Sequence, residues 1–161
     1  MSATTKRTLP GLLLAAALLG LAGCQSRVPG SAETSAAYFV KQNVTFRAKG
    51  DNPFPATKEN ILAGQRAFSS YCTVCHGLDG QNTGVPFAKK MSPPVPSLAS
   101  PRVQAYSDAQ LKRVVESGIF PSGMPAAKGT LSDEEIWEIV VFLRHLPPPG
   151  SLGEPSIYSG N

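Results

Sequence analysis

Residues 72–76 constrain the chain more than any other part of its sequence. They read Cys-Thr-Val-Cys-His, so two thiols stand three residues apart and an imidazole follows the second thiol directly. A Cys-x-x-Cys pair is used in disulfides, in thioredoxin-like redox centres, in zinc sites and in the attachment of haem. A plain disulfide gives His76 no role, and a thioredoxin-like centre needs a βαβ pattern that this sequence lacks. A zinc site needs a fourth ligand, for which only His145 is available.

The motif therefore predicts one covalently bound haem c, attached through Cys72 and Cys75. Two thiols at this spacing, at the end of a helix, can reach the two vinyl groups on one edge of a porphyrin. His76 then stands where it can bind the iron from the same side. A covalent link also helps a small chain, because a core of fewer than about 100 residues is marginally stable without such a staple.

The N-terminus has the pattern of an export signal. Lys6 and Arg7 precede residues 11–22, an uncharged apolar run of 12 residues. A helix that spans a bilayer needs about 20 such residues, so the run fits the apolar part of a secretory signal rather than a membrane span. We expect residues 1–23 to be a signal peptide that directs export.

The end of this signal resembles the lipobox of bacterial lipoproteins, on the residues Leu21-Ala22-Gly23-Cys24. The resemblance implies cleavage before Cys24, lipid on its sulfur, and acylation of its new amino end. Two or three acyl chains anchor a protein stably where one does not. The mature chain is then expected on the periplasmic side of a bacterial membrane, lipid-anchored through Cys24. The alternative is an ordinary signal peptide with an incidental cysteine.

The charge of the chain gives no support to a nucleic-acid partner. The formal net charge is +4, and removal of Lys6 and Arg7 with the signal leaves 13 basic against 11 acidic residues, a net +2. Two haem propionates would cancel this excess. No basic run of the length expected for phosphate binding is present. We therefore expect partners other than DNA or RNA.

Apolar periodicity and capping residues predict three main helices and an all-α fold. The first begins at Thr57, a suitable N-cap, and runs to the Cys-x-x-Cys-His motif. The second begins at Ser107 and stops at Gly118. The third begins at Ser132, which forms a capping box with Glu135, and a run of prolines ends it.

The remaining segments fit neither a helix nor a strand pattern. Residues 24–56 are expected to be a lipid-anchored linker, with a short extended piece at 38–47 where the alternation is weak. Residues 77–101 are rich in Gly and Pro. Such a long irregular segment suits a compact domain only if it wraps around something other than protein. Residues 148–161 are expected to form a loose tail.

Residues 57–147 resemble a class I c-type cytochrome domain. The resemblance rests on Gly64-x-x-x-Phe68-x-x-x-Cys72, the CTVCH motif, Pro96-x-Leu98, Gly123-Met124-Pro125 and the terminal helix LSDEEIWEIVVFLRHL. It implies three helices wrapped around one haem that has His/Met axial ligation. It also implies a monohaem one-electron carrier of a respiratory or related redox chain, rather than an enzyme. Its partners would be other redox proteins or a larger respiratory complex.

Met124 is the favoured sixth ligand within this resemblance. Met1 is lost with the signal, and Met91 follows His76 closely in a Pro-rich stretch. Met124 lies in a Gly-Met-Pro loop that can present its sulfur to the opposite face of the haem. Met91 stays as an alternative, and His145 would compete only if no methionine binds. At the end of the last helix, His145 is expected to be a surface residue.

The resemblance also suggests supporting residues around the haem. The Nδ1–H of His76 needs an acceptor that fixes the ring, and the family pattern points to the Pro96 carbonyl, with that of Pro94 as the alternative. Leu98 would pack on the haem, or else serve as ordinary core.

Several apolar residues are assigned to the helix packing. Gly64 would permit close approach of the first and last helices, and their crossing would be filled by Phe68, Ile139 and Phe142. Trp137 would lie against the haem or cap the core.

Three functional hypotheses are open at this point. The first is a mobile carrier, and the second is a fixed electron-transfer subunit of a larger redox enzyme. The third is a ligand-binding or peroxidase-type haem protein, which Met124 argues against. Basic residues could form a rim for acidic partners, or be scattered over a solvated surface. They are Lys89, Lys90, Arg102, Lys112 and Arg113.

Overall fold

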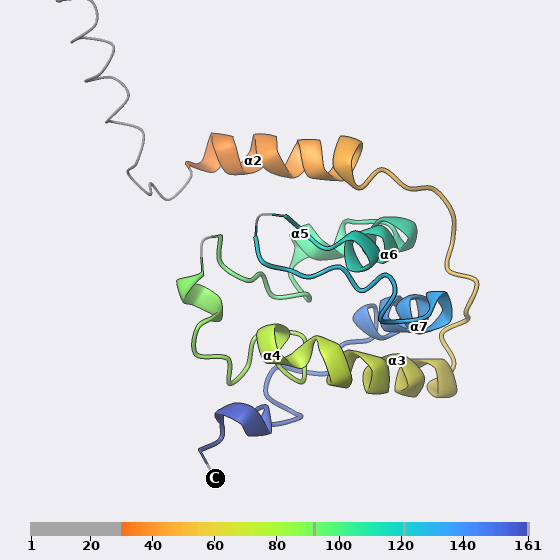
Figure 1. The fold of residues 1–161 in the computed structure, drawn as a ribbon, viewed down its shortest axis with the longest axis vertical. Coiled ribbons are helices and arrows are strands. Elements are labelled where there is room, and N and C mark those ends of the chain that lie inside the picture. The colour runs from red at the N-terminus through yellow and green to blue at the C-terminus, as the bar shows by residue number, and fades with distance from the viewer. Residues whose placement is uncertain (1–29, 92, 121, 161) are drawn as a thin grey trace, which may run out of the picture.

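The computed structural model describes residues 30–91, 93–120 and 122–160, and this part of the chain contains helices and no strand (Figure 1). The elements are α2 (Ser31–Val40), the π-helical turn η2 (Lys41–Thr45), α3 (Lys58–Tyr71), α4 (Thr73–His76), the 3₁₀ turn η3 (Ala88–Lys90), α5 (Pro101–Gln104), α6 (Asp108–Ser117), α7 (Asp133–Leu143) and the 3₁₀ turn η4 (Ser156–Tyr158). The expected all-α fold is confirmed. The predicted signal peptide and Cys24 lie outside the described residues.

None of the described helices is long and apolar enough to cross a membrane.

The crossing of α3 and α7 is the centre of the fold, and Gly64 makes it possible. A Cβ atom placed on Gly64 would lie 1.9 Å from the carbonyl oxygen of Glu138, which is far closer than any real contact. One turn further along α3, the rings of Phe68 and Phe142 lie 5.2 Å apart in a tilted arrangement. The predicted close approach is confirmed, because only a residue without a side chain fits at position 64.

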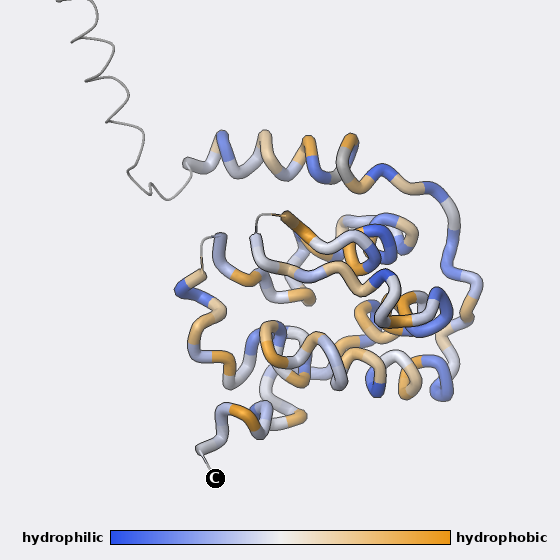
Figure 2. The backbone as a smooth tube through the Cα atoms, viewed as in Figure 1, coloured by the Kyte–Doolittle hydropathy of each residue, from blue (hydrophilic) through white to orange (hydrophobic). Residues whose placement is uncertain are grey.

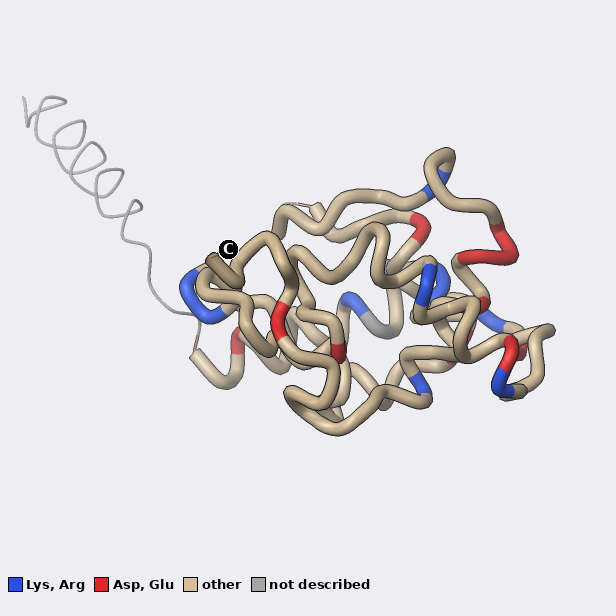
Figure 3. The backbone as a smooth tube through the Cα atoms, turned by 90° about the horizontal axis from the view of Figure 1, so that it is seen from below, with Lys and Arg blue, Asp and Glu red and all other residues tan. Residues whose placement is uncertain are grey.

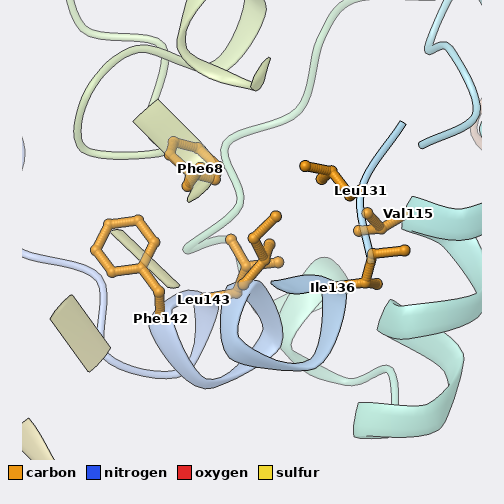
Figure 4. Close-up of a cluster of buried hydrophobic side chains, with 7 residues drawn as sticks. Phe68, Val115, Leu131, Ile136, Phe142 and Leu143 are labelled. Atoms are coloured by element: carbon orange, nitrogen blue, oxygen red, sulfur yellow. The ribbon is translucent and has the colours of Figure 1, made fainter. Parts of the chain in front are cut away.

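The core extends from this crossing toward α6 (Figure 4). Its buried members are Phe68, Val115, Leu131, Ile136, Ile139, Phe142 and Leu143. They come from α3, α6, α7 and the residue just before the α7 cap. Because each helix buries one apolar face against the others, the spacing of apolar residues in the sequence indicates all three main helices, α3, α6 and α7.

All three helices begin where the capping residues predict. The hydroxyl of Thr57 accepts from the backbone N–H of Asn60. Ser107 and Ser132 each form a capping box with the residue three positions on, and the second is the predicted pair with Glu135. Each cap satisfies backbone donors that a helix start otherwise leaves unpaired.

The segment before α3 differs from the expected linker. Residues 38–47, expected to hold a short extended piece, fall largely in α2 and η2. Tyr38 fixes α2 to the domain: its ring meets Tyr106 edge-to-face at 5.5 Å, and its hydroxyl donates to the carbonyl of Arg102 at 2.6 Å. These partners lie more than 60 residues away, so a local pattern could not reveal them.

Residues 77–100 are irregular, as predicted, apart from the turn η3. The segment folds back on itself, since Leu98 donates its N–H to Gly80 at 2.8 Å and Val95 donates to Ala88 at 2.9 Å. The short helix α5 follows directly, and only Pro101 at its first position could have indicated it.

The C-terminal segment is not a loose tail. Gly150 donates its N–H to the carboxylate of Asp79 at 2.7 Å, and the Tyr158 hydroxyl donates to the Val74 carbonyl at 2.9 Å. Pro155 is buried. We call residues 147–160 the C-terminal strap, because hydrogen bonds join them to the attachment motif and to the loop after His76, and the ring of Tyr158 also meets that of Phe87 at 6.0 Å.

Candidate haem site

The attachment motif sits at a break between two helices. Cys72 ends α3, donating its N–H to Phe68 at 2.8 Å, and it also starts α4, where its carbonyl accepts from His76 at 2.9 Å. Both thiols are partly exposed, and neither is in a disulfide. Two thiols and one imidazole thus come from one short stretch of chain at this break.

Cys72 is held as a neutral thiol. Burial, followed by the neighbouring Cys75, raises its pKa to about 12. A zinc site needs further ligands, and among the described residues no group of three His, Cys, Asp or Glu side chains is placed to hold a metal ion. The zinc alternative therefore gains no support.

His76 is a neutral imidazole, which is the form that binds iron. Burial lowers its pKa to about 4, and this effect is partly opposed by a hydrogen bond with the Pro96 carbonyl. Its Nδ1 atom is shielded from solvent and lacks a partner in strict hydrogen-bond geometry. The Pro96 carbonyl acts on the pKa of His76 although it makes no well-aligned hydrogen bond with Nδ1, so it lies near Nδ1 but off the ideal hydrogen-bond direction. The carbonyl that acts on the pKa of His76 is thus that of Pro96, the favoured candidate, rather than that of Pro94.

Asn82 positions the Pro96 segment, and the sequence did not single it out. Its backbone N–H donates to the His76 carbonyl at 2.7 Å, and its side-chain amide donates to the Val95 carbonyl at 2.8 Å. It therefore links the end of α4 to the residue before Pro96. Its φ of +64° is a left-handed conformation, which Asn tolerates better than most residues. An Asn six residues after His76, a residue type that tolerates a left-handed turn, was the one sequence feature that could have pointed to this role.

Met124 is presented by a short hairpin after α6. Ile119 donates its N–H to the Met124 carbonyl at 3.0 Å, and the Ser122 hydroxyl caps the turn on the Ile119 carbonyl at 2.7 Å. Gly118 has a φ of +63°, and a Cβ atom there would lie 2.5 Å from the Met124 carbonyl oxygen. The hairpin thus needs glycine at position 118, and it fixes the backbone of the methionine.

The expected site residues converge on one core. Cys72, Leu98 and Met124 come from three separate segments, and each packs against the same cluster of buried residues. Phe68 belongs to that cluster and also faces His76, with 6.5 Å between the ring centroids. Cys72, Met124 and, through Phe68, the imidazole of His76 thus border one apolar region, as a covalently held haem requires.

The alternatives for the sixth ligand are placed differently. Met91 is half-buried, and its methyl carbon lies 3.7 Å from where a Cβ atom of Gly123 would be, so it borders the same hairpin. His145 is exposed at the end of α7, with its Nδ1 at 2.8 Å from the Val141 carbonyl. It is a surface residue, as expected.

Trp137 has a contact on α6. It is half-buried, and the Lys112 ammonium stands 5.4 Å from its ring centre. Lys112 also pairs with Glu116 and Asp133, and Arg102 stacks over Tyr38. Two of the five basic residues considered as a rim, Lys112 and Arg102, are thus engaged in such contacts, and charges of both signs are spread over the domain (Figure 3).

Comparison with known proteins decides the family. Residues 59–143, just over half of the chain, match the family described as "Cytochrome C oxidase, cbb3-type, subunit III". The chain belongs to this cytochrome c family. The matched range runs from α3 to the end of α7 and includes the attachment motif. The cytochrome thus carries one covalently bound haem c and functions in electron transfer, in agreement with the class I resemblance.

Two curated relatives are larger redox enzymes. The cytochrome is 30% identical over 87 residues to thiosulfate dehydrogenase of Allochromatium vinosum. The aligned region is 53% of this chain and 31% of that relative. It is 25% identical over 95 residues to quinohemoprotein alcohol dehydrogenase ADH IIB of Pseudomonas putida. Here the aligned region is 56% of this chain and 12% of the relative. The similarity thus spans less than a third of either relative.

Proposed function

We propose that this cytochrome is a one-electron carrier between redox proteins, and that it has no chemical reaction of its own. The haem, when bound, supplies an iron that takes up and releases one electron. The observation that carries the proposal is the convergence of Cys72, His76 and Met124 on one apolar core. In this assignment Cys72 and Cys75 would attach the haem, and His76 and Met124 would bind its iron.

The chain's own residues would hold both ligands still. His76 is already neutral and buried, and the Pro96 carbonyl would accept from its Nδ1–H and orient the ring. The Met124 hairpin is fixed by backbone hydrogen bonds to Ile119. Ligands that do not move between the two oxidation states favour fast transfer, and a thioether ligand favours the reduced state. Leu98 would shield the haem from water.

The cytochrome is further proposed to be exported and lipid-anchored. The proposal is supported by the basic and apolar pattern before residue 24 and by the resemblance of residues 21–24 to a lipobox. Cys24 would carry the lipid, on the periplasmic side of a bacterial membrane. A mass measurement of the mature protein tests both parts: it should begin at Cys24 and carry acyl chains. A mature protein that starts elsewhere would refute the anchor and leave the haem assignment intact.

A fixed place in a larger redox complex is the second candidate. It is favoured by the family description, which names an oxidase subunit, and by two relatives in which the matched region is a small part of a larger redox enzyme. Crosslinking in native membranes, followed by identification of the attached proteins, distinguishes a stable complex from transient partners.

The ligand assignment is tested with a matched pair of methionine variants. Met124→Ala should abolish the long-wavelength ferric absorption band of methionine-bound haem and lower the potential by on the order of 100 mV, because the thioether ligand is lost. Met91→Ala, which alters a neighbouring methionine, should keep the band. Visible spectra and redox titration of the two holoproteins provide the measurement.

The reverse pattern would assign Met91 as the ligand. Carbon monoxide binding by the reduced wild-type protein would instead favour an open sixth position and a ligand-binding haem protein. A mature protein without covalent porphyrin, produced in cells able to attach haem, would refute the haem assignment altogether.

A further inference from the structure

The α2–η2 segment has two faces, and the structure accounts for only one of them. On the inner face, Tyr38 packs against Tyr106 and donates to the Arg102 carbonyl. The guanidinium of Arg102 stands 5.1 Å from the centre of the Tyr38 ring. Just after η2, Phe46 is only 4% exposed. These contacts dock the segment on the domain.

The outer face is apolar and uncovered. Phe39, Val40 and Val44 are 64%, 49% and 70% exposed, so three large apolar side chains face solvent within six residues. Val40 and Val44 continue a row of exposed alanines, Ala32 and Ala36, at a spacing of four. Residues four apart lie one above the other on a helix. Figure 2 shows apolar residues concentrated toward the C-terminal half of α2. A cluster of this kind marks a contact surface more often than a single exposed residue does.

The charge around this face favours an anionic lipid surface as its occupant. From Gly30 to Gly50 the chain carries Lys41, Arg47 and Lys49 against a single acidic residue, Glu33. Arg47 and Lys49 are exposed. Helices with an apolar face and flanking Lys or Arg bind in the headgroup region of bilayers, and anionic lipids strengthen that binding.

The position of the segment in the chain points to the same occupant. Ser31, the first residue of α2, comes seven residues after Cys24, the proposed lipid-bearing residue. Seven extended residues span at most about 25 Å. A lipid at Cys24 would therefore hold α2 within that distance of the membrane surface. The proximity rests on the proposed anchoring, whereas the apolar and charged features do not.

We propose that the outer face of α2 and η2, formed by Ala32, Ala36, Phe39, Val40 and Val44, lies in the interface of an anionic bilayer. Tyr38 then transmits this placement to the domain through its contacts with Arg102 and Tyr106. In Figure 1, α2 runs along one edge of the molecule, and α3, α4 and the C-terminal strap run along the opposite edge. The attachment motif consequently faces away from the bilayer, where water-borne partners can reach it.

The test is amide hydrogen exchange of the lipid-anchored holoprotein in vesicles of phosphatidylethanolamine and phosphatidylglycerol. Amides of residues 38–45 should exchange about tenfold more slowly in the wild type than in Val40→Asn/Val44→Asn, because insertion of the apolar face suppresses opening of the helix. Leu62→Asn is the matched control: it makes an exposed apolar residue of α3 polar, and it should leave exchange of 38–45 unchanged.

Equal exchange in the wild type and the double variant would overturn the proposal. So would protection that rises with protein concentration without vesicles, which would assign the face to a second copy of the chain. Protection of the same size on phosphatidylcholine vesicles would overturn the role of the basic residues. The haem spectrum and the mass of the modified N-terminus are recorded on the same samples, so failure of the proposed function or of the anchor is seen separately.

Discussion

The α3–α7 crossing and the loop after His76 are held by different kinds of interaction. At the crossing, Phe68 and Phe142 bury aromatic rings where Gly64 lets two backbones meet. In the loop, the fully buried carboxylate of Asp79 accepts hydrogen bonds from Gln81, Thr83 and Gly150. Apolar burial is spread over many weak contacts, whereas several hydrogen bonds of the loop meet on one carboxylate. The crossing should thus be sensitive to added side-chain volume, and the loop to loss of the Asp79 charge.

The largest effect is expected at the crossing itself. Gly64→Val should destabilise the holoprotein by about 4 kcal/mol or prevent folding, because the added atoms would overlap the Glu138 carbonyl and force α3 and α7 apart. Denaturant unfolding followed by circular dichroism measures it. Gly30→Val is the control, since a Cβ atom at Gly30 meets nothing within 4 Å. A Gly64→Val protein of normal stability would show that the crossing is not tightly packed.

An intermediate effect is expected for the loop. Asp79→Asn should cost about 2–3 kcal/mol, because an amide keeps the shape of the carboxylate but loses its charge and one acceptor for buried donors. Burial alone would raise the pKa of Asp79, but the hydrogen bonds from Gly150 and Thr83, with that from Gln81, together outweigh it and lower the pKa. A carboxyl whose pKa is lowered in the folded state contributes stability above its ordinary pKa near 4, and that contribution is lost as the pH falls.

Stability measured between neutral pH and about pH 3 therefore separates two explanations. The wild type should lose stability on acidification more steeply than Asp79→Asn does. Parallel curves for the two proteins would show that the charge of Asp79 is irrelevant and that only its shape matters.

The smallest effect is expected at a helix end. Ser132→Ala removes the hydroxyl that accepts from the Glu135 N–H at the start of α7, and it should cost about 1 kcal/mol. Ser132→Thr keeps an acceptor and should recover most of that loss. If alanine and threonine are equally stable at this position, the cap contributes nothing and α7 is held by its apolar face alone.

The contrast between the two regions also explains which parts of the structure could be predicted from sequence. The helix starts at Thr57, Ser107 and Ser132 could be predicted because the capping residue and the regularly spaced apolar residues of each helix lie within one stretch of chain. Gly64 could be assigned because a small residue on an apolar face implies a close neighbour. The haem-attachment residues could be found because Cys72, Cys75 and His76 stand within five positions.

The segments that escaped prediction depend on distant polar partners. Tyr38 docks α2 through a carbonyl at Arg102, and Gly150 fixes the C-terminal strap through a carboxylate at Asp79. Asn82 donates its backbone N–H to His76 and its side-chain amide to Val95, and so joins two segments of the loop. Neither a hydrogen bond to a remote backbone group nor a left-handed turn leaves a periodic trace in the sequence, so these segments read as irregular.

The C-terminal strap has a consequence for the attachment motif. Tyr158 holds the carbonyl of Val74, which lies between the two cysteines, and Gly150 holds the carboxylate of Asp79, three residues after His76. Residues more than 70 positions further along the chain therefore restrain the backbone on both sides of His76. The geometry of the thiols is thus a property of the folded domain as a whole and not of the short motif alone.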